Sequence, residues 1–286
     1  MTIISPIDRM NSETRVNYGP VPHQLFNRPL DEMQWQILGD EFLLRGCASH
    51  YFYYRKGQGV TIERGPGADV SEESLWLNGS VYAGVASLNG LMPIHASAVE
   101  SGGHVFAFTG PGGAGKSTLV AALGDLGLPM FCDDTLILDL SDPDRVMCLP
   151  GHKRLKLTPE ALALTGADRQ EKVSATVGKY YSLAASGVVG DTLPLGELIF
   201  LEEGEGSMIE PVSGSQRFAR LQDDHHTAHL FAWARRFERA DQFAHSLRLA
   251  QQISMARFVR PHDPDRFHAG VAIVKQYLEG RSNGPA

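Results

Sequence analysis

Cysteine is scarce in this sequence: there are three, Cys47, Cys132 and Cys148, among 286 residues. Their odd number argues against a disulfide framework, and no pair of them has the close spacing typical of a metal site. Apolar runs long enough to span a bilayer are lacking as well. Residues 1–11 contain no basic stretch followed by an apolar one, so we expect no signal peptide. These absences predict a protein of the cytoplasm without a membrane partner.

An excess of positive charge is also missing. The net charge is −7 and the isoelectric point is about 5.9, which argues against a general nucleic-acid partner. The hydrophobic fraction of 43 % and the charged fraction of 21 % are ordinary for a globular protein. A length of 286 residues is enough for one large domain or for a domain with a smaller module.

Short β-prone runs dominate the first part of the chain. Strands are predicted at 51–54 and 59–62, with a glycine-containing turn between them. We therefore predict a small β-rich N-terminal portion, and we expect its first 20 or so residues to be loosely ordered. The predicted organisation is a β-rich portion at 1–80, a catalytic domain at 81–280 and a polar tail at 281–286.

In the rest of the chain, strand patterns alternate with helix patterns. Strands are predicted at 95–99 and 104–108, joined by a turn that contains Gly102 and Gly103. Apolar residues at helical spacing predict a helix over 116–126. Further predicted elements are helices at 81–91 and 159–164, a buried strand at 197–201, and mainly helical structure from 223 to about 256 and from 264 to 278.

A glycine-rich loop at 110–117 matches the pattern G-x-x-x-x-G-K-[ST] at every fixed position. Glycines let successive backbone N–H groups turn inward and cradle phosphate oxygens. Lys116 is expected to reach the β- and γ-phosphates of a nucleotide, and the Ser117 hydroxyl to ligate Mg²⁺. The strand before the loop and the helix after it are the setting that the motif requires, so an accidental glycine-rich turn is the weaker alternative. The predicted ATP-binding residues of the loop are Gly110, Gly112, Gly113, Ala114, Gly115, Lys116, Ser117 and Thr118.

Two consecutive acids follow this loop. Asp133 and Asp134 lie 17 and 18 residues after Lys116, which leaves room for one helix, a turn and a short strand at 130–132. A parallel strand there would place both carboxylates at its C-terminal edge, beside the loop. One acid could then hold Mg²⁺ while the other takes the proton of an attacking hydroxyl. The alternative is that the pair caps a turn, where aspartate is common.

The order of these motifs resembles the HPr kinase/phosphorylase family. In that family a histidine-bearing strand (94–99 here, with His95), a phosphate loop and an Asp-Asp pair follow one another at this spacing. The resemblance covers residues 80–157. It implies an α/β fold with a P-loop kinase core of the HPr kinase/phosphoenolpyruvate carboxykinase-like type, a mixed sheet and a helical C-terminal part. It also implies a catalytic set in which Asp133 is the general base, Asp134 is a metal or water ligand, His95 orients Asp133, and Lys116 contacts the phosphates.

The segment 151–157 looks like one that is common in shorter relatives of the family, and it makes Arg154 a candidate to neutralise phosphate charge. Such relatives occur beside genes for ribosomally made peptides, including lasso-peptide precursors, and resemble kinases that act on a serine of the precursor. Two departures separate this chain from HPr kinases proper. Ser117 and Thr118 stand where a serine and a glutamate are usual, and the C-terminal segment for the reverse, phosphate-dependent reaction has no counterpart. Both argue against a phosphorylase activity and against HPr as the substrate.

Other charged groups are weaker candidates. The basic cluster at 153–156 suits a phosphate or an acidic peptide, and a solvated basic face explains it about equally well. Lys179, beside two tyrosines, is a candidate contact for nucleotide or substrate. His225 and His229 have the i, i+4 spacing of metal ligands on a helix, but no glutamate follows the first histidine, which favours a structural or surface role.

Together the motifs predict a kinase that uses Mg²⁺ and ATP and transfers the γ-phosphate to a serine of a peptide or small protein. Three alternatives stay open: a kinase of small-molecule hydroxyls with the same site, a nucleotide-dependent switch or ATPase, and a non-catalytic nucleotide-sensing module, against which the intact lysine, hydroxyl and two aspartates argue. Against the switch, the chain has no Asn-Lys-x-Asp motif and no Leu-Ser-Gly-Gly-Gln signature. The sequence favours no particular oligomeric state.

Overall fold

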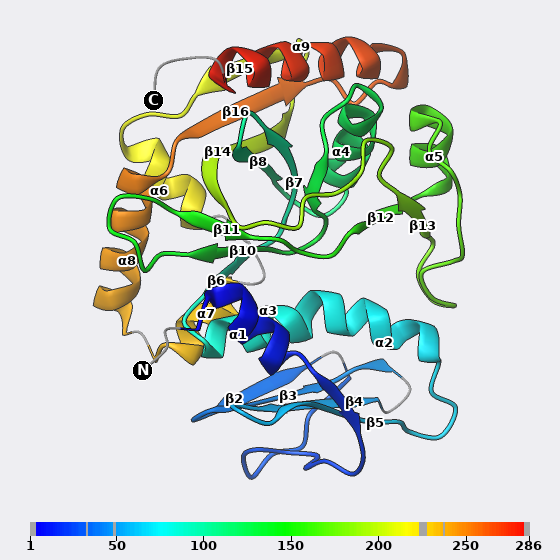
Figure 1. Cartoon of the computed structure of the whole chain (residues 1–286), viewed down its shortest axis with the longest axis vertical. Coiled ribbons are helices and arrows are strands. Elements are labelled where there is room, and N and C mark those ends of the chain that lie inside the picture. Colours follow the sequence, from blue (N-terminus) through cyan, green and yellow to red (C-terminus); the bar gives the residue numbers. More distant parts are fainter. Residues whose placement is uncertain (1–3, 33, 48–49, 223–227, 237, 283–286) are drawn as a thin grey trace.

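The computed structural model describes residues 4–32, 34–47, 50–222, 228–236 and 238–282. Over these residues the chain forms a mixed α/β structure, and Figure 1 shows a smaller sheet at one end, drawn in blue, and a larger sheet beyond it. A long helix, drawn in cyan, runs between the two sheets. No helix within the described ranges is both long enough and apolar enough to cross a membrane.

The smaller sheet has one face on a hydrophobic core. In the strand at Tyr51–Arg55, Phe52 and Tyr54 are fully buried, whereas Tyr51 and Tyr53 are half-buried, which is the period of two expected for such a sheet. In spatial order the five strands are β1 (Val16–Tyr18), β5 (Gly59–Glu63), β4 (Tyr51–Arg55), β3 (Glu41–Arg45) and β2 (Trp35–Leu38). β1 pairs parallel with β5, and the other neighbours pair antiparallel.

Within residues 4–20 a helix and a strand are present, whereas loose order was predicted for about the first 20 residues. Ser5 caps the helix α1 (Pro6–Glu13), because its hydroxyl accepts the backbone N–H of Asp8 at 3.2 Å. Met10 is 2 % exposed and anchors the helix in the core of the N-terminal portion. The prediction of loose order is wrong, because the cap, the buried anchor and the pairing of β1 all hold this segment in place.

One long helix joins the two sheets. It consists of α2 (Val70–Trp76), a π-helical stretch η2 (Leu77–Val81) and α3 (Tyr82–Leu88). α3 is buried along its length, and the core around it takes in Phe42 from the smaller sheet and Ile137 from the larger one. The predicted helix at 81–91 is confirmed in its central part. The predicted domain boundary after residue 80 falls inside η2.

The larger sheet contains the predicted hairpin. Its nine strands are β6 (Met92–Ile94), β7 (Ala96–Ser101), β8 (His104–Thr109), β9 (Met130–Cys132), β10 (Leu136–Asp139), β11 (Met147–Leu149), β14 (Leu193–Glu203), β15 (Met208–Pro211) and β16 (Met255–Arg260). β7 and β8 form the antiparallel hairpin predicted at 95–99 and 104–108. β14 lies parallel to β8, and β16 lies parallel to β14, so three strands in the middle run in one direction.

The short strand β9 pairs differently from the prediction. It is antiparallel to β7, with Cys132 opposite Ala98, whereas a parallel strand was expected. Because β7 is also antiparallel to β8, the strands β9 and β8 point the same way. The residues that follow β9 and the loop that follows β8 therefore meet at the same edge of the sheet.

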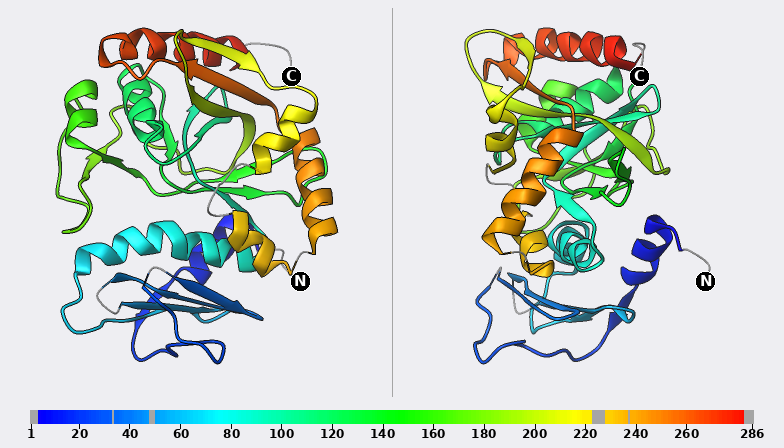
Figure 2. Two further views of the ribbon diagram at one scale, coloured as in Figure 1. Left: turned by 180° about the vertical axis from the view of Figure 1, so that it is seen from behind. Right: turned by 90° about the vertical axis from the view of Figure 1, so that its left-hand side faces the viewer.

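Helices cover both faces of the larger sheet, because its central strands are apolar on both sides. In β8, Phe106 and Phe108 face one core, while Val105 and Ala107 face the other. The helices are α4 (Lys116–Asp125), α5 (Pro159–Thr165), α6 (Ser215–Gln222), α7 (Ala228–Ala234), α8 (Arg239–Gln252) and α9 (Pro264–Ser282). α4, α5 and α9 pack on the first core, and α6 and α8 on the second. Figure 2 shows from two further sides that α9 and the smaller sheet lie at opposite ends of the molecule.

The C-terminal part holds elements that the sequence patterns did not reveal. α8 ends at Gln252 and β16 follows, where helix was predicted to about residue 256 and no element was predicted over 257–263. α6 and β15 were not predicted either. Phe258 is fully buried in β16 because it lies beside β14, a strand about 55 residues earlier, and no local pattern carries that pairing. The predicted elements at 116–126, 159–164, 197–201 and 264–278 are confirmed as α4, α5, part of β14 and α9.

Candidate nucleotide and acceptor site

The glycine-rich loop joins the end of β8 to the start of α4. Gly113 and Gly115 have φ angles of 84° and 80°, in the left-handed region that favours glycine. Gly110 has φ 146°, and a Cβ on it would lie 3.1 Å from the carbonyl oxygen of Leu201. A Cβ on Gly115 would lie 2.6 Å from an Nη atom of Arg260. The glycines at these positions are therefore required by the path of the loop and by its close neighbours.

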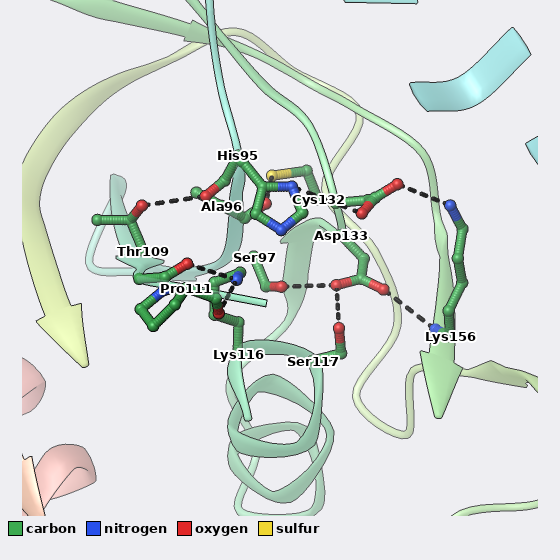
Figure 3. Close-up of polar contacts among 12 residues, drawn as sticks. His95, Ala96, Ser97, Thr109, Pro111, Lys116, Ser117, Cys132, Asp133 and Lys156 are labelled. Atoms are coloured by element: carbon green, nitrogen blue, oxygen red, sulfur yellow. Dashed lines mark hydrogen bonds and ion pairs between the residues drawn. The ribbon is translucent and has the colours of Figure 1, made fainter. Parts of the chain in front are cut away.

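Lys116 lies at the mouth of this loop and is 6 % exposed. Its ammonium group donates to the carbonyl oxygens of Gly110 at 2.8 Å and Pro111 at 3.0 Å (Figure 3). Burial lowers the pKa of Lys116 to about 8, although Asp133 and Asp134 act in the opposite direction. A cation held at the start of a helix, next to inward-turned glycines, is the arrangement that binds phosphate.

The carboxylate of Asp133 is enclosed on the loop side and is only 1 % exposed. Oδ1 accepts the hydroxyls of Ser97 at 2.6 Å and Ser117 at 2.7 Å (Figure 3). Oδ2 accepts the backbone N–H of Lys156 at 3.0 Å. Three donors hold this carboxylate in one orientation, directly beside the hydroxyl of the phosphate loop.

The neighbouring Asp134 is more open, with 32 % of its side chain exposed. Its backbone is left-handed, with φ 73°, which costs a non-glycine residue about 1–3 kcal/mol and occurs preferentially at functional sites. Oδ2 accepts Lys156 Nζ at 2.8 Å, and Oδ1 lies 3.7 Å from His95 Nδ1. Burial acts to raise the pKa of Asp134, but the charge and hydrogen bond of Lys156, with smaller contributions from His95 and Lys179, outweigh it and lower the pKa to about 2.

This geometry adds contacts that the resemblance did not imply. His95 Nδ1 lies within ion-pair distance of Asp134 Oδ1, whereas the resemblance implied that His95 orients Asp133, a role that stays a prediction. The Ser117 hydroxyl is bonded to Asp133, whereas Asp134 was predicted as its partner at the metal. The reason is local: the left-handed backbone at Asp134 sends the two consecutive side chains to different sides of the site.

Ser117 and Asp133 present a hydroxyl and a carboxylate oxygen 2.7 Å apart, a donor set that suits Mg²⁺. Among the described residues there is no group of three His, Cys, Asp or Glu side chains that could hold a metal ion by itself. Mg²⁺ usually takes one or two protein ligands and completes its shell with water and substrate phosphates. The residues present therefore fit a Mg²⁺ ion that enters with a nucleotide.

A cavity of about 790 Å³ opens in front of these groups. Four cationic side chains line it: Lys116, Lys156, Lys179 and Arg260. The predicted site residues that line it are His95, Gly112, Gly113, Gly115, Lys116, Ser117, Thr118 and Asp134. Ala114 instead borders a second cavity of about 290 Å³ on the other side of the loop, together with Gly112 and Gly113. α5 and the start of α9 close the larger cavity with Ala161, Leu164, Pro264 and Phe267.

Arg154 does not take the predicted position. It lies on β12 (Arg154–Leu157), which pairs with β13 (Tyr180–Leu183) in a separate two-stranded sheet. Its guanidinium bonds to Glu171 at 2.5 Å and stacks 3.9 Å from the ring centre of Tyr181. It is outside the set of described residues that line the cavity. The prediction that Arg154 neutralises phosphate charge is therefore not supported by its contacts, and Lys156 is the member of the basic cluster that reaches the site.

Arg260 is the site residue that the sequence patterns missed. It ends β16, and its guanidinium donates to the carbonyl oxygen of Ala114 at 2.7 Å. Burial lowers its pKa. The only available signal was its place at the C-terminal end of a strand, where α/β sheets bind ligands, and that strand itself was not predicted. His225 lies outside the described residues, as does the side chain of His229, so the structure adds nothing to the metal pattern noted there.

A scan against protein-family models finds no match, and a search of the curated proteins finds no relative. Among solved structures, the chain is similar to the Hpr(Ser) kinase/phosphatase from Coxiella burnetii, with a TM-score of 0.33 and 14 % sequence identity. The matched region covers 66 % of this chain and 99 % of that one. A likeness this distant assigns neither a family nor an activity.

Proposed function

We propose that this chain is a kinase that uses Mg²⁺ and ATP and transfers the γ-phosphate to a hydroxyl group, with a serine of a peptide or small protein as the acceptor. The observation that carries the proposal is the different setting of the two aspartates. Asp133 is bonded to Ser117 at 2.7 Å, whereas Asp134 faces the same cavity with an open carboxylate. A second carboxylate that is exposed to the cavity can accept a hydrogen bond from the hydroxyl group of the acceptor.

On the nucleotide side, the chain supplies donors and positive charge. Lys116 exchanges the carbonyl oxygens of Gly110 and Pro111 for phosphate oxygens, and Arg260 lies beside the loop as a second cation. Ser117 and Asp133 would hold Mg²⁺, which would offset negative charge on the phosphates. Preorganised charge of this kind is the main source of catalysis in phosphoryl transfer.

On the acceptor side, Asp134 accepts a hydrogen bond from the attacking hydroxyl. The hydroxyl oxygen forms a bond to the γ-phosphorus, and the bond from that phosphorus to the β–γ bridging oxygen breaks with its electron pair leaving on ADP. The hydroxyl proton passes to Asp134. Because the pKa of Asp134 is lowered to about 2, it is a weak base, and orientation of the hydroxyl is its larger contribution.

The finer proposal is that the acceptor belongs to a ribosomally made peptide precursor, of which lasso-peptide precursors are one class. Its support is the order of motifs around His95, the phosphate loop and Asp133-Asp134. The test is intact-mass analysis of peptides encoded beside the gene after incubation with the protein, Mg²⁺ and ATP. We expect a gain of one phosphate mass, abolished by Asp134→Asn. ATP consumption without any phosphorylated peptide or small hydroxyl compound would leave an ATPase switch as the function.

A further inference from the structure

The cavity in front of the phosphate loop has two regions of different chemistry. One region is polar and contains His95, Asp134 and Lys156, which form the ion pairs described above. The other is lined by apolar side chains of α5 and of the start of α9, namely Ala161, Ala163, Leu164, Pro264 and Phe267. The proposed function uses the polar region and the loop, and it leaves the apolar region without a ligand.

The helix that follows the loop holds the apolar region in place. α4 packs against both α5 and α9. Leu119 of α4, Leu162 of α5 and Phe267 of α9 belong to one buried core. The first residues of α4, 116–118, line the same cavity as the apolar side chains of α5 and α9. The two apolar walls therefore flank the helix N-terminus at which the loop ends.

The loop also determines in which direction a bound nucleotide runs. The backbone N–H groups of such a loop cradle the α- and β-phosphates, while its lysine reaches the β- and γ-phosphates. For transfer to a hydroxyl held by Asp134, the γ-phosphate has to lie on the Asp134 side. The α-phosphate then lies on the other side, together with the ribose and the base that it carries. The lining of the cavity there is Thr118 and the apolar walls.

The charged side chains of the cavity agree with this direction. Lys116 and Arg260 donate to carbonyl oxygens of the loop. Burial is the main cause that lowers the pKa of Lys116, and the nearby charge of Lys179 adds to it. The charged groups beside the apolar walls are instead carboxylates, Glu160 on α5 and Asp263 directly before α9. Carboxylates repel phosphate and accept N–H groups such as those on the edge of a base, so this region suits the uncharged part of a nucleotide.

The smaller cavity on the other side of the loop is the competing place for a base. Its volume is about 290 Å³, against about 790 Å³ for the larger one, and its lining includes Leu201, Glu202 and Glu203. Residues 116–118, which start α4, line the larger cavity and are not among the described residues that line the smaller one. A base in the smaller cavity would be separated from its own phosphates by the backbone of the loop.

We infer that α5 and the start of α9 form the binding site for a nucleobase, so that the phosphate donor is a nucleoside triphosphate and not an inorganic polyphosphate. The base lies between Ala163 and Leu164 on one side and Pro264 on the other. This inference rests on the proposed kinase function and specifies the donor that the same site takes. Burial of the ring between apolar walls adds affinity that a bare triphosphate cannot obtain.

The test compares the affinities for ATP and for inorganic triphosphate, each titrated with Mg²⁺ in a calorimeter. Wild-type protein should bind ATP roughly 10- to 100-fold more tightly, because only ATP buries a ring. Ala163→Trp fills the base site from an exposed helix position, so it should weaken ATP binding by about tenfold or more and leave triphosphate binding unchanged. Ala269→Trp is the control, because Ala269 is exposed on α9 and is not among the residues that line the cavity. It should behave as wild type.

The outcomes separate the inference from the proposed function. If Ala163→Trp leaves the affinity for ATP unchanged, the inference fails and the proposed kinase is untouched. If Ala163→Trp weakens ATP and triphosphate equally, α5 contacts phosphate and the inference fails as well. If wild-type protein binds neither ATP nor triphosphate, the proposed function fails together with the inference.

A second measurement covers the case that Ala163→Trp does not fold. Hydrogen exchange of the wild-type protein is followed with a non-hydrolysable ATP analogue and, separately, with inorganic triphosphate. Protection over 159–165 and 264–268 that appears with the ATP analogue alone supports the inference. Additional protection confined to 201–203, or no protection beyond that given by triphosphate, overturns it.

Discussion

The nucleotide side and the acceptor side of this site are built in opposite ways. The nucleotide side is one continuous loop, 110–118, closed by a buried Asp133 with three hydrogen-bond donors. The proposed acceptor side is assembled from His95, Asp134 and Lys156, which come from different elements of the chain. Consecutive backbone groups can bind phosphate almost by themselves, whereas acceptor recognition depends on tertiary contacts.

The largest effect is expected from a substitution on the acceptor side. Asp134→Asn keeps the size of the side chain and removes its charge, so it should lower the rate of phosphoryl transfer by about 10²- to 10⁴-fold. ATP affinity should stay within about twofold of wild type, because the loop contacts Asp133 and not Asp134. Single-turnover transfer and ATP titration measure the two quantities separately. If Asp134→Asn lowered the transfer rate and the ATP affinity together, the proposed separation of the nucleotide side from the acceptor side would be wrong.

Lys116→Met addresses the nucleotide side. It removes the cation at the loop mouth, and we expect kcat to fall on the order of 10²- to 10³-fold together with weaker ATP binding. Lys275→Met is a matched control, because Lys275 pairs with Glu279 on α9 and is not among the residues that line the cavity. An unchanged ATP affinity in Lys116→Met would show that the loop does not bind the nucleotide.

Lys156→Met tests the electrostatics of the acceptor side. The Lys156 side chain holds the pKa of Asp134 well below its ordinary value of 3.8, so its removal should raise that pKa. The acid limb of the pH–rate profile should then move to higher pH. Asp133 should be little affected, because its bond from residue 156 comes from the backbone N–H. An acid limb at the wild-type position would mean that Asp134 does not control it.

The same ion pair has a consequence for stability. A carboxylate whose pKa is lowered on folding stabilises the protein above its unfolded pKa and loses this contribution as the pH falls through its folded pKa. For Asp134 the contribution is fully present above about pH 4 and disappears towards pH 2. Acid unfolding of Lys156→Met should begin at higher pH than that of the wild type.

The smallest effect is expected at Arg154. Arg154→Ala should leave kcat and KM within about twofold of wild type, since a surface ion pair contributes about 0–1 kcal/mol and this one lies apart from the cavity. Steady-state kinetics with ATP and the acceptor measure both constants. If Arg154→Ala lowered kcat as much as Lys116→Met, Arg154 would have the role of neutralising phosphate charge that its contacts argue against.

Local sequence patterns were enough to predict the glycine-rich loop and the elements on either side of it. The glycine spacing, the short apolar runs of β7 and β8 with the turn between them, and the helical period of α4 are all properties of consecutive residues. The same patterns placed Asp133 and Asp134 beside the loop. They did not predict which of the two carboxylates contacts Ser117, because that depends on the pairing of β9 with β7 and on the left-handed backbone of Asp134.

The other site residues could not be predicted, because their positions depend on pairing between segments that are distant in sequence. Arg260 reaches the loop only because β16 lies beside β14, and neither the strand nor its partner is evident from residues 255–260 alone. The ion pair of Lys156 with Asp134 likewise joins two segments that are far apart in sequence. Features of this kind depend on contacts between segments and not on periodicity.

The most direct test of the account is calorimetric titration of ATP, with and without Mg²⁺, into wild-type protein, Asp133→Asn and Asp134→Asn. The titration needs no knowledge of the acceptor. Because Asp133 is bonded to the loop hydroxyl of Ser117, its variant should lose most of the Mg²⁺-dependent gain in affinity, while Asp134→Asn should keep it. If Asp134→Asn loses the gain and Asp133→Asn keeps it, the assignment of the two carboxylates is contradicted.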